Sequence, residues 1–414
     1  MFKGVKMKIK VNSEIGKLKK VLLHRPGNEL LNLTPECLER LLFDDIPYLE
    51  IAQKEHDEFS GILRANGVEV YYIENMVAEA IENTEAKEEF LTTFVNEAID
   101  TNESIVNKEE AKRVLRKYLD NIEDNKQLVD LTIAGLRVSD LPEKVEVTDD
   151  YYFVADPLPN LYFQRDPFAS IADGASINHM MSVTRNRETL YAYTMFKYHP
   201  EFKDSGVKFW YDRKDTTSIE GGDQLVINKH TLMIGISQRT QEESIEKLAK
   251  RVFADPDNEI DTIYGFDIGA SRAYMHLDTV FTQVDKDKFS VHPDAINEGM
   301  RIKVYKKDGD AIQIEEKHDV KLEELLAEAT GNDKVTLIPC GAGDPIASMR
   351  EQWNDGANTL AIAPGEVVVY SRNPITNEEL RKQGIKVHVM SSSELSRGRG
   401  GPRCMSMPLE REEL

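Results

Sequence analysis

The sequence predicts an α/β protein in which repeated β-β-α-β modules form a propeller that is interrupted by an inserted all-helical subdomain. Two observations lead to this prediction. Strand–strand–helix–strand units recur along the chain, and β-rich modules that must protect their edges often close into a propeller. Residues 76–148, by contrast, nearly lack glycine and carry apolar residues at helical spacing. We therefore expect residues 1–75 and 149–414 to form the propeller and residues 76–148 to form the helical insertion.

The composition of the chain is that of a soluble globular protein with an acidic surface. Of its 414 residues, 40% are hydrophobic and 30% are charged, and 73 acidic against 52 basic side chains give a formal charge of −21. Such a surface repels the phosphates of nucleic acids and attracts small cationic molecules. The sequence therefore argues against nucleic acid as a partner and favours a cationic substrate.

The sequence contains no pattern that predicts export or membrane insertion. The first ten residues carry four lysines, but no apolar run follows them, so they do not resemble a signal peptide. No apolar run approaches the length that spans a bilayer. The three cysteines, Cys37, Cys340 and Cys404, are odd in number and far apart, which is typical of a reducing compartment. We expect a cytoplasmic protein with no membrane partner.

The first part of the chain predicts strands and helices in alternation. The strand Leu18–Leu23 ends at a turn that contains His24, which we interpret as a structural residue. A helix begins at Thr34–Glu36, a second helix is expected over Tyr48–Ala65, and the strand Val68–Ile73 follows it.

The insertion predicts several helices in succession. Apolar residues recur at helical spacing, as at Phe90, Phe94 and Ala98. The expected helix caps are Asn83, Asn102 and Ser139. Nothing in this block predicts catalysis, and we interpret its charges as a solvated face.

After Pro142 the chain repeats one pattern. A strand ends near an arginine and runs into a helix, and another strand precedes it across a tight turn. The strands that end near an arginine are Ala175–Val183 before Arg185, Thr231–Ser237 before Arg239, and Glu366–Tyr370 before Arg372. The strands that precede them are Leu161–Phe163, Gln224–Ile227 and Asn358–Ala363. The expected helices include Gln241–Phe253 and Thr376–Gln383, and the strand Ile385–Met390 follows the second of these.

Four clusters of reactive side chains stand at the ends of predicted strands. Asp166 precedes a proline, Glu220 and Asp223 flank two glycines, and His276 and Asp278 share one face of a predicted strand. Each acid or histidine alone has a structural explanation, as a turn cap, a hairpin bend or a buried core histidine. The fourth cluster is the loop around the last cysteine.

The loop around Cys404 predicts a nucleophile. Three glycines within four residues precede the thiol, and Arg399 and Arg403 bring positive charge that favours a thiolate. Beyond the thiol, Met405 and Met407 predict that the chain returns to an apolar core. A flexible tail with a chance cysteine would show no such return.

Together, the four clusters supply the parts for attack by a thiol on an electrophilic carbon of a cationic substrate. A guanidinium group carries its N–H donors in a planar fork, and two carboxylates are its natural partners. Zinc is the rival use of Cys, His and Asp. No two of these residues stand at the spacing of a known zinc motif, so we expect no metal.

Four motifs in this order resemble the arginine deiminase family, and the resemblance covers essentially the whole chain. They are Asn160–Pro167, Ser218–Asp223, His276–Asp278 and Arg403–Pro408. The resemblance implies an α/β propeller of five pseudo-repeats with a helical insertion. It also implies hydrolysis of free L-arginine to L-citrulline and ammonia without a cofactor, as the first step of arginine fermentation.

The resemblance also assigns roles to single residues. It implies that Cys404 is the nucleophile, that His276 is the general acid and base, and that Glu220 orients His276. Asp166 and Asp278 are expected to hold the substrate guanidinium. The expected contacts to the rest of the substrate are Asn160, Phe163, Arg185, Arg239 and the backbone of Gly398. The reaction would pass through an amidino-cysteine intermediate, a thiouronium.

Two alternatives remain at this point. Another guanidine-modifying enzyme, such as an amidinotransferase or a dimethylarginine hydrolase, would use a similar set of residues. A non-catalytic propeller that serves as a binding module would not need a nucleophile. We further expect a homo-oligomer, a dimer or larger.

Overall fold

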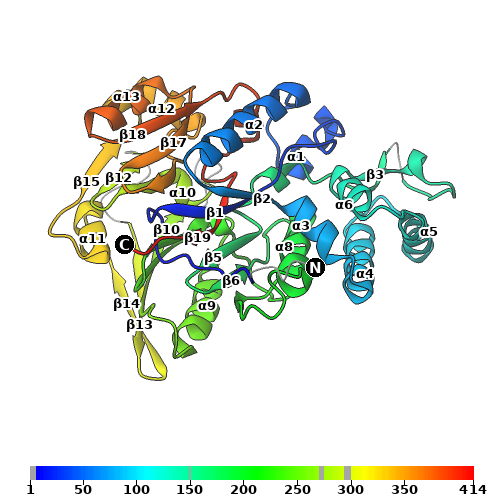
Figure 1. The fold of residues 1–414 in the computed structure, drawn as a ribbon, viewed down its shortest axis with the longest axis horizontal. Helices are drawn as coiled ribbons and strands as arrows, with labels where there is room; N and C mark the ends of the chain where they lie inside the picture. Colours follow the sequence, from blue (N-terminus) through cyan, green and yellow to red (C-terminus); the bar gives the residue numbers. More distant parts are fainter. Residues whose placement is uncertain (1–5, 149–150, 270–274, 293–299) are drawn as a thin grey trace.

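The computed structural model describes residues 6–148, 151–269, 275–292 and 300–414, and it is an α/β protein (Figure 1). Residue 149, where the second part of the predicted propeller starts, lies outside the described residues. In Figure 1, helices α4 (Thr84–Asp100), α5 (Lys108–Asp120) and α6 (Asn125–Ala134) lie together at one end of the molecule. Most of the β-structure lies on the other side of the molecule (Figure 1).

Five sheets in the described part of the chain contain the same unit of three strands. Its first two strands pair antiparallel, its second and third pair parallel, and a helix connects the second strand to the third. We call these units modules one to five. Module one is β5 (Phe168–Ile171), β6 (Gly174–Ile177), α8 (Glu188–Tyr198) and β7 (Lys208–Tyr211). Module two is β8 (Gln224–Asn228), β9 (Thr231–Ser237), α9 (Glu242–Ala254) and β10 (Thr262–Gly269).

The remaining modules repeat this order of elements. Module three is β11 (Phe281–Asp285), β12 (Lys288–Val291), α11 (Leu322–Thr330) and β15 (Thr336–Pro339). Module four is β16 (Leu360–Ala363), β17 (Glu366–Tyr370), α13 (Pro374–Lys382) and β18 (Lys386–Met390). Module five is β19 (Met407–Arg411), β1 (Leu18–Leu23), α2 (Leu49–Ala65) and β2 (Glu69–Tyr72). A hairpin of β13 (Ile302–Asp308) and β14 (Ala311–Lys317) extends the sheet of module two.

Module five joins distant parts of the chain. Strand β19 pairs antiparallel with β1, with Met407 opposite Leu22. Met405 and Met407 are both fully buried, so the predicted return of the chain to a core after Cys404 is confirmed. This pairing fixes the segment that carries the thiol beside the other modules.

The helices of the insertion share their core with module one. Phe90 of α4 packs edge-on against Tyr191 of α8, with 5.5 Å between the ring centroids. Asn83 caps α4, as predicted, by accepting the N–H of Ala86 at 3.1 Å. The prediction for Asn102 is wrong: this side chain donates to the carbonyl of Phe153 at 3.0 Å and ties the insertion to the neighbouring strand.

Short-range patterns predicted most strands and helices well. The strands Leu18–Leu23, Thr231–Ser237 and Glu366–Tyr370 have the expected bounds. The expected strand Leu161–Phe163 is wrong, because this stretch belongs largely to the 3₁₀ helix η3 (Pro159–Tyr162), whose proline favours a helical start.

Two further expectations about strands are wrong at residues of interest. His276 precedes the single helical turn α10 (Leu277–Val280), and its carbonyl accepts the hydroxyl of Thr279 at 2.7 Å, a contact that favours a turn over a strand. Arg185 does not end a strand, because it belongs to the short helix α7 (Val183–Asn186), which follows β6 after a loop. Arg239 does follow the end of β9 closely.

His24 lies in a buried cluster far from the predicted nucleophile in sequence. Its ring nitrogens contact Glu74 at 2.9 Å and Glu29 at 3.1 Å. Burial alone would lower the pKa of His24, but the two carboxylates outweigh burial and raise it to about 10. A cavity of about 740 Å³ adjoins this cluster, and none of the predicted site residues lines it.

Two general features complete the fold. Cys37, Cys340 and Cys404 are all buried free thiols. Within the described ranges, every helix is too short or too polar to cross a lipid bilayer.

Candidate active site

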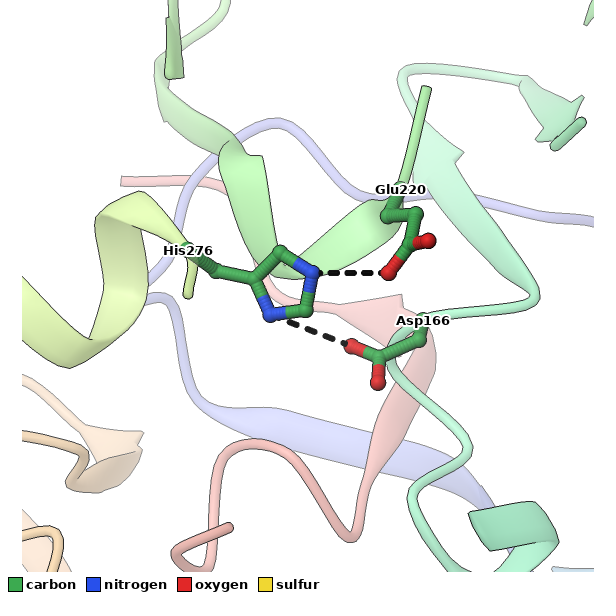
Figure 2. Close-up of side chains that lie close together, drawn as sticks. All are labelled: Asp166, Glu220 and His276. Atoms are coloured by element: carbon green, nitrogen blue, oxygen red, sulfur yellow. Dashed lines mark hydrogen bonds and ion pairs between the residues drawn. The ribbon is translucent and has the colours of Figure 1, made fainter. Parts of the chain in front are cut away.

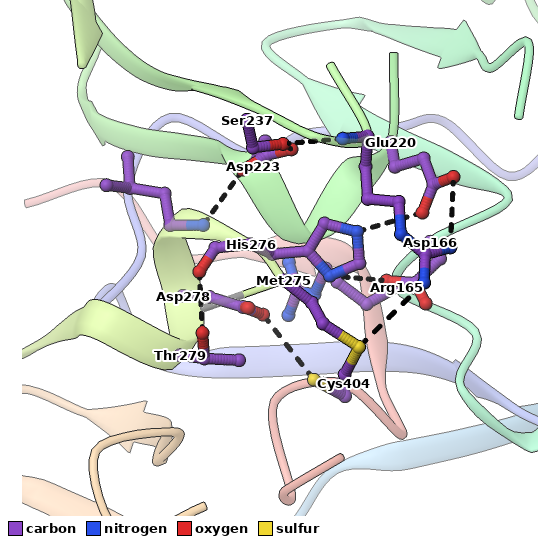
Figure 3. Close-up of polar contacts among 12 residues, drawn as sticks. Arg165, Asp166, Glu220, Asp223, Ser237, Met275, His276, Asp278, Thr279 and Cys404 are labelled. Carbon is purple, nitrogen blue, oxygen red and sulfur yellow. Dashed lines mark hydrogen bonds and ion pairs between the residues drawn. The ribbon is translucent and has the colours of Figure 1, made fainter. Parts of the chain in front are cut away.

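The candidate catalytic side chains lie on the segments that enter the first strand of four modules. Asp166 precedes β5, Glu220 precedes β8, His276 precedes β11 and Cys404 precedes β19. The sequence analysis placed the corresponding clusters at the ends of strands, whereas the structure places them before the strand that opens each module. Figure 3 shows these side chains pointing toward one another, together with Asp278. None of the five is more than 4% exposed.

His276 lies between two carboxylates (Figure 2). Its Nε2 atom contacts Oε2 of Glu220 at 2.8 Å, and its Nδ1 atom lies 3.8 Å from Oδ1 of Asp166. The ring packs on the backbone of Gly222, where a Cβ atom would stand 2.7 Å from the imidazole. Glycine is therefore required beside His276, which explains one glycine of the Glu220–Asp223 motif.

The charges around His276 favour the imidazolium form. Burial alone would lower its pKa, but the charge of Asp166 and the hydrogen bond to Glu220 outweigh burial and raise the pKa to about 9. Burial would raise the pKa of Glu220, but Arg239, His276 and Arg185 lower it to about 2. At neutral pH, His276 therefore holds a proton that it can give away, and Glu220 is its anionic partner.

Two arginines from modules one and two face the same carboxylates. Arg185 donates to Asp166 at 3.0 Å and to Glu188 at 3.0 and 2.9 Å. Its Nη1 atom lies 4.0 Å from Glu220, and Nη1 of Arg239 lies 3.9 Å from the other oxygen of Glu220. Both guanidinium groups are thus brought to the site, as the sequence analysis expected.

Asp166, Glu220 and His276 lie close enough together to be considered as ligands of a metal ion. One ligand atom each from Asp166, Glu220 and His276 lies within 4.8 Å of the other two. Arg185 and Arg239, however, already direct positive charge at these carboxylates over 3.0 to 4.0 Å. A metal cation would be repelled there, so the donor set fits a role in orienting His276 better than metal binding.

The thiol of Cys404 is held by groups from two other modules. Its backbone N–H donates to Oδ1 of Asn358 at 3.1 Å, and Sγ lies 3.6 Å from Oδ2 of Asp278. Burial, followed by the charges of Asp278 and Asp166, raises the pKa of Cys404 well above its ordinary value.

We expected nearby arginines to favour the thiolate of Cys404. This expectation is wrong when only the charges of the protein itself are counted. Arg403 donates to Glu14 at 2.9 and 3.0 Å and to Asp278 at 2.8 Å, so carboxylates already balance its charge. The guanidinium of Arg399 lies 3.7 Å from the ring centroid of Trp353. Additional positive charge is needed beside Cys404 before its thiolate becomes favourable.

Several polar atoms at the site have no hydrogen-bond partner among the described residues. They are Oδ1 of Asp166, Oδ1 of Asp278, and Nε and Nη1 of Arg239. Buried polar atoms are rarely left without partners, and such atoms need an explanation. Two carboxylate oxygens and two guanidinium nitrogens suit a ligand with a cationic donor group at one end and an anionic group at the other.

The remaining predicted contacts lie on two segments that pack together. Asn160 donates to the carbonyl of Leu41 at 2.6 Å. Phe163 is buried in the same apolar cluster as Cys404. Gly398 ends the 3₁₀ helix η7 (Leu395–Gly398) and is buried as well. The structure thus brings Phe163 close to the loop that carries the thiol, whereas Asn160 already binds backbone.

Asn358 and Glu14 were not among the site residues predicted from the sequence. Asn358 accepts from Cys404 and also donates to the carbonyl of Asp278 at 3.1 Å, so it joins the two. It precedes β16, the position in module four that corresponds to the catalytic segments of the other modules. The repeat therefore carried a signal for Asn358. Glu14 carried none, because its contact with Arg403 spans 389 positions of the sequence.

Comparisons with known proteins show which family the chain resembles. The family model for arginine deiminase matches residues 39–411. The arginine deiminase of Clostridium perfringens is 53% identical over 419 residues, with 98% of each chain covered. That of Streptococcus gordonii is 51% identical over 415 residues, with 98% of this chain and 99% of the relative covered.

Solved structures with much lower identity share the fold. An amidinotransferase from Microseira wollei of the saxitoxin biosynthetic pathway superposes with a TM-score of 0.56 at 15% identity, covering 98% of both chains. A dimethylarginine dimethylaminohydrolase superposes with a TM-score of 0.50 at 13% identity, covering 94% of this chain and 99% of the other. The family model and the relatives above 50% identity, which span nearly the whole sequence, place this chain in the arginine deiminase family.

Proposed function

We propose that this protein hydrolyses free L-arginine to L-citrulline and ammonia through a covalent amidino-cysteine intermediate. The observation that carries the proposal is the pair of buried carboxylates beside Cys404, Asp166 and Asp278, each of which keeps one oxygen without a hydrogen-bond partner among the described residues. Two such carboxylates complement the N–H donors of a guanidinium group. Relatives named arginine deiminase at 51–53% identity support the same substrate.

The substrate supplies the charge that activates the thiol. Asp278 and Asp166 raise the pKa of Cys404, and a guanidinium bound between them neutralises both. The positive charge then lies next to Sγ and lowers the pKa of the thiol. Ionisation of Cys404 is thereby coupled to binding of a cation.

In the first half of the reaction, the thiolate of Cys404 attacks the guanidinium carbon and forms an S–C bond. His276, held as an imidazolium by Glu220, gives its proton to the departing nitrogen. The C–N bond breaks, ammonia leaves, and the amidino group remains on sulfur. His276 is now neutral.

In the second half, neutral His276 takes a proton from a water molecule. The hydroxide attacks the amidino carbon and the S–C bond breaks. The oxygen then loses its remaining proton, which the released ammonia takes up as ammonium, and stays on the carbon as the carbonyl of citrulline. His276 ends as the imidazolium again, and the thiolate of Cys404 is restored. One base therefore serves both halves.

The other end of the substrate is held by Arg239 and Arg185. Arg239 supplies the two donors without partners, so it is the main contact of the α-carboxylate. Arg185 is already shared by Asp166 and Glu188 and adds charge to the same end. We assign the remaining contacts along the substrate to Asn160, Phe163 and the backbone of Gly398.

The five modules form a five-fold pseudo-symmetric α/β propeller in this proposal, with residues 1–75 and 149–414 as propeller and 76–148 as insertion. The recurrence of one strand order in five sheets supports this arrangement. We also propose a cytoplasmic location, supported by the three free thiols. Ile346, Met349 and Trp353 on α12 (Pro345–Trp353) are 60–67% exposed, which supports a homo-oligomer of two or more copies.

The test is to incubate the purified protein with L-arginine and to measure citrulline and ammonia in parallel. Equal amounts of both products are expected, and Cys404→Ser should form neither because a hydroxyl ionises far less than a thiol. An acid quench should trap an amidino group on the peptide that contains Cys404. A trapped group on Cys340, or turnover by the serine variant at the wild-type rate, would overturn the proposal.

Two parallel reactions separate the alternatives. Transfer of the amidino group to an added amine such as glycine, with release of ornithine, would identify an amidinotransferase. Faster turnover of N,N-dimethylarginine than of L-arginine would identify a dimethylarginine hydrolase. A chain that binds L-arginine but forms no product would be a binding module.

A further inference from the structure

A further buried carboxylate, Asp223, lies near the proposed catalytic side chains. It lies on the side of His276 that faces away from the substrate. Asp223 ends the 3₁₀ helix η4 (Gly221–Asp223) and is fully buried. Its two oxygens accept three hydrogen bonds, from the N–H of Leu277 at 2.9 Å, the hydroxyl of Ser237 at 2.8 Å and the hydroxyl of Thr240 at 2.6 Å. Figure 3 shows Asp223 beside Ser237, on the far side of His276 from Cys404.

The bond from Leu277 fixes module three. Leu277 stands between His276 and Asp278, at the start of the single turn α10. Through this N–H, Asp223 holds the backbone that carries His276 and Asp278. His276 is the proposed general acid, and Asp278 is one of the carboxylates proposed to bind the guanidinium group. A shift of this turn would move His276 and Asp278 together.

The bonds from the two hydroxyls fix module two. The Ser237 oxygen accepts the N–H groups of Arg239 at 3.0 Å and of Thr240 at 3.1 Å, and the Thr240 oxygen accepts the N–H of Glu220 at 3.1 Å. Each hydroxyl therefore relays the position of Asp223 to a residue of the site. The backbones of Glu220 and Arg239 are both tied to one carboxylate.

The network requires a carboxylate at this position. The Ser237 oxygen already accepts two N–H groups, so its own hydrogen must point at an acceptor. The amide of an asparagine offers only one acceptor oxygen and would direct N–H at a hydroxyl or at the N–H of Leu277. Gly235 lies against the Asp223 carboxylate, where a Cβ atom would overlap it, so glycine at position 235 leaves the room that this carboxylate fills.

We propose that Asp223 is a positioning residue for the reaction, and that its carboxylate aligns His276 and Asp278 of module three with Glu220 and Arg239 of module two. This inference rests on the proposed function. Asp223 touches no reacting atom, and its effect is exerted through the Leu277 amide and the Ser237 and Thr240 hydroxyls. It gives a positioning role to a residue to which the family resemblance assigned none.

The test compares Asp223→Asn and Ser237→Ala with Ser244→Ala, whose buried hydroxyl in module two bonds the carbonyl of Ser218 instead. Asp223→Asn should lower kcat for L-arginine roughly 10- to 100-fold, the loss expected for misplaced catalytic groups. Ser237→Ala removes the acceptor of the Arg239 and Thr240 N–H groups but leaves the bond from the Thr240 hydroxyl to Asp223, so it should raise KM for L-arginine more than it lowers kcat. Ser244→Ala should match the wild type in both constants.

A second readout does not depend on turnover. The charge of Asp223 is among the causes that raise the pKa of His276. In NMR titrations of histidine-labelled protein, assigned with His276→Gln, the His276 signal of Asp223→Asn should therefore titrate at lower pH than in the wild type. This titration reports the effect of Asp223 on His276 separately from any change of the melting temperature.

The outcomes separate the two claims. A wild-type protein that forms no citrulline overturns the proposed function, whereas an unchanged His276 titration in folded Asp223→Asn overturns the positioning role whatever the turnover. Kinetic constants of Asp223→Asn and Ser237→Ala equal to those of Ser244→Ala, measured well below the melting temperature, overturn it as well. If Asp223→Asn does not fold, the change of KM relative to kcat in Ser237→Ala decides the proposal.

Discussion

The thiol of Cys404 donates a hydrogen bond to Oδ2 of Asp278 over 3.6 Å, and the same oxygen accepts a hydrogen bond from Arg403 at 2.8 Å. The candidate nucleophile thus shares its nearest carboxylate with an arginine that Glu14 also binds. Burial and the charges of Asp278 and Asp166 keep the thiol protonated. In the proposed reaction, activation comes from a cation that binds between these two carboxylates.

The first prediction concerns the ionisation of this thiol. Asp278→Asn removes one of the charges that raise the pKa of Cys404, so alkylation of Cys404 by the neutral reagent iodoacetamide should reach its maximum at lower pH than in the wild type. Citrulline formation should fall at the same time, because the guanidinium loses a charged partner. Mass spectrometry of the Cys404 peptide, quenched at intervals across a pH series, measures the first effect.

The control for this experiment is Asp310→Asn, at an exposed carboxylate of the β13–β14 turn. It should change neither the alkylation profile nor the turnover. An alkylation profile of Asp278→Asn that coincides with the wild type would mean that Asp278 does not govern the thiol.

The second prediction concerns the basic limb of the pH profile. The pKa of His276 is raised to about 9, so the imidazolium is present below that value and the acid needed for ammonia release is lost as the pH rises through it. Glu220→Gln removes one cause of this shift, so the basic limb of kcat/KM should move to lower pH. Profiles of kcat/KM for both proteins, with exposed Glu243→Gln as the control, measure the shift.

The stability of this pair follows from the same pKa values. The contribution of His276 is fully present below pH 6.5 and is lost as the pH rises through about 9. The contribution of Glu220 is present above pH 4.5 and is lost as the pH falls through about 2. If the basic limb of Glu220→Gln stays at the wild-type pH, Glu220 does not raise the pKa of His276.

The third prediction concerns recognition of the α-carboxylate. Arg239 keeps two nitrogens without hydrogen-bond partners in the described part of the protein, so Arg239→Ala should affect the ligand more than the fold. Loss of one charged pair in a closed site typically costs about 2–5 kcal/mol, which is more than tenfold in kcat/KM for L-arginine. Agmatine, which lacks the carboxylate, should be a poor substrate of the wild type, and the variant should lower its kcat/KM by a smaller factor than that of L-arginine.

The contrast between the two substrates is the measurement that decides this role. Exposed Arg381→Ala on α13 serves as the control and should leave both substrates unchanged. Equal kcat/KM values of the wild type for agmatine and L-arginine would show that Arg239 serves the fold.

Local patterns in the sequence predicted some of the five modules but not all of them. Alternating and β-branched residues marked Thr231–Ser237 and Glu366–Tyr370 with the right bounds. Modules three and five were both missed. Module five was missed because its first strand, β19, and its second, β1, come from opposite ends of the sequence. Around His276, four residues were too few to distinguish a strand from the turn α10, whose geometry depends on Asp223 and Thr279.

The side chains to which we assign chemical roles were easier to predict from the sequence than the groups that hold them. Cys404, His276 and Glu220 stood out because nucleophiles, imidazoles and glycine-flanked acids are rare and recognisable. Asn358 and Glu14 are ordinary polar residues in sequence, and only the packing of modules brings them to Cys404 and Arg403. Electrostatics was misjudged for the same reason: the arginines near Cys404 were visible in sequence, but their acidic partners were not.

The fourth prediction concerns Glu14. It accepts two hydrogen bonds from Arg403 and one from the N–H of Val226 at 3.1 Å. Burial would raise its pKa, but Arg403 and Arg165 lower it to about 2, so its stabilising contribution is present above pH 4.5 and is lost as the pH falls through about 2. Glu14→Gln should lower the free energy of unfolding by about 3–5 kcal/mol, the usual cost of breaking a buried ion pair.

Denaturant unfolding at pH 7 measures this loss. The matched control is Glu143→Gln, which breaks exposed pairs with Lys117 and Arg113 and should leave the free energy of unfolding nearly unchanged. The difference between Glu14→Gln and the wild type should shrink near pH 2, where Glu14 itself becomes protonated. Equal unfolding curves for the wild type and Glu14→Gln at pH 7 would mean that Asp278 alone stabilises the buried charge of Arg403.

The last prediction is that the helical insertion contributes no catalytic group. The side chains around Cys404 come from segments that open modules, whereas the exposed charges of α4 and α5 pair with one another, as Arg116 does with Glu88. Glu88→Ala and Glu109→Ala should therefore leave kcat within about threefold of the wild type, since exposed substitutions rarely matter. Citrulline assays and sedimentation of each variant separate effects on chemistry from effects on assembly. A single exposed residue here whose loss removes activity, while folding and association stay as in the wild type, would place part of the chemistry in the insertion.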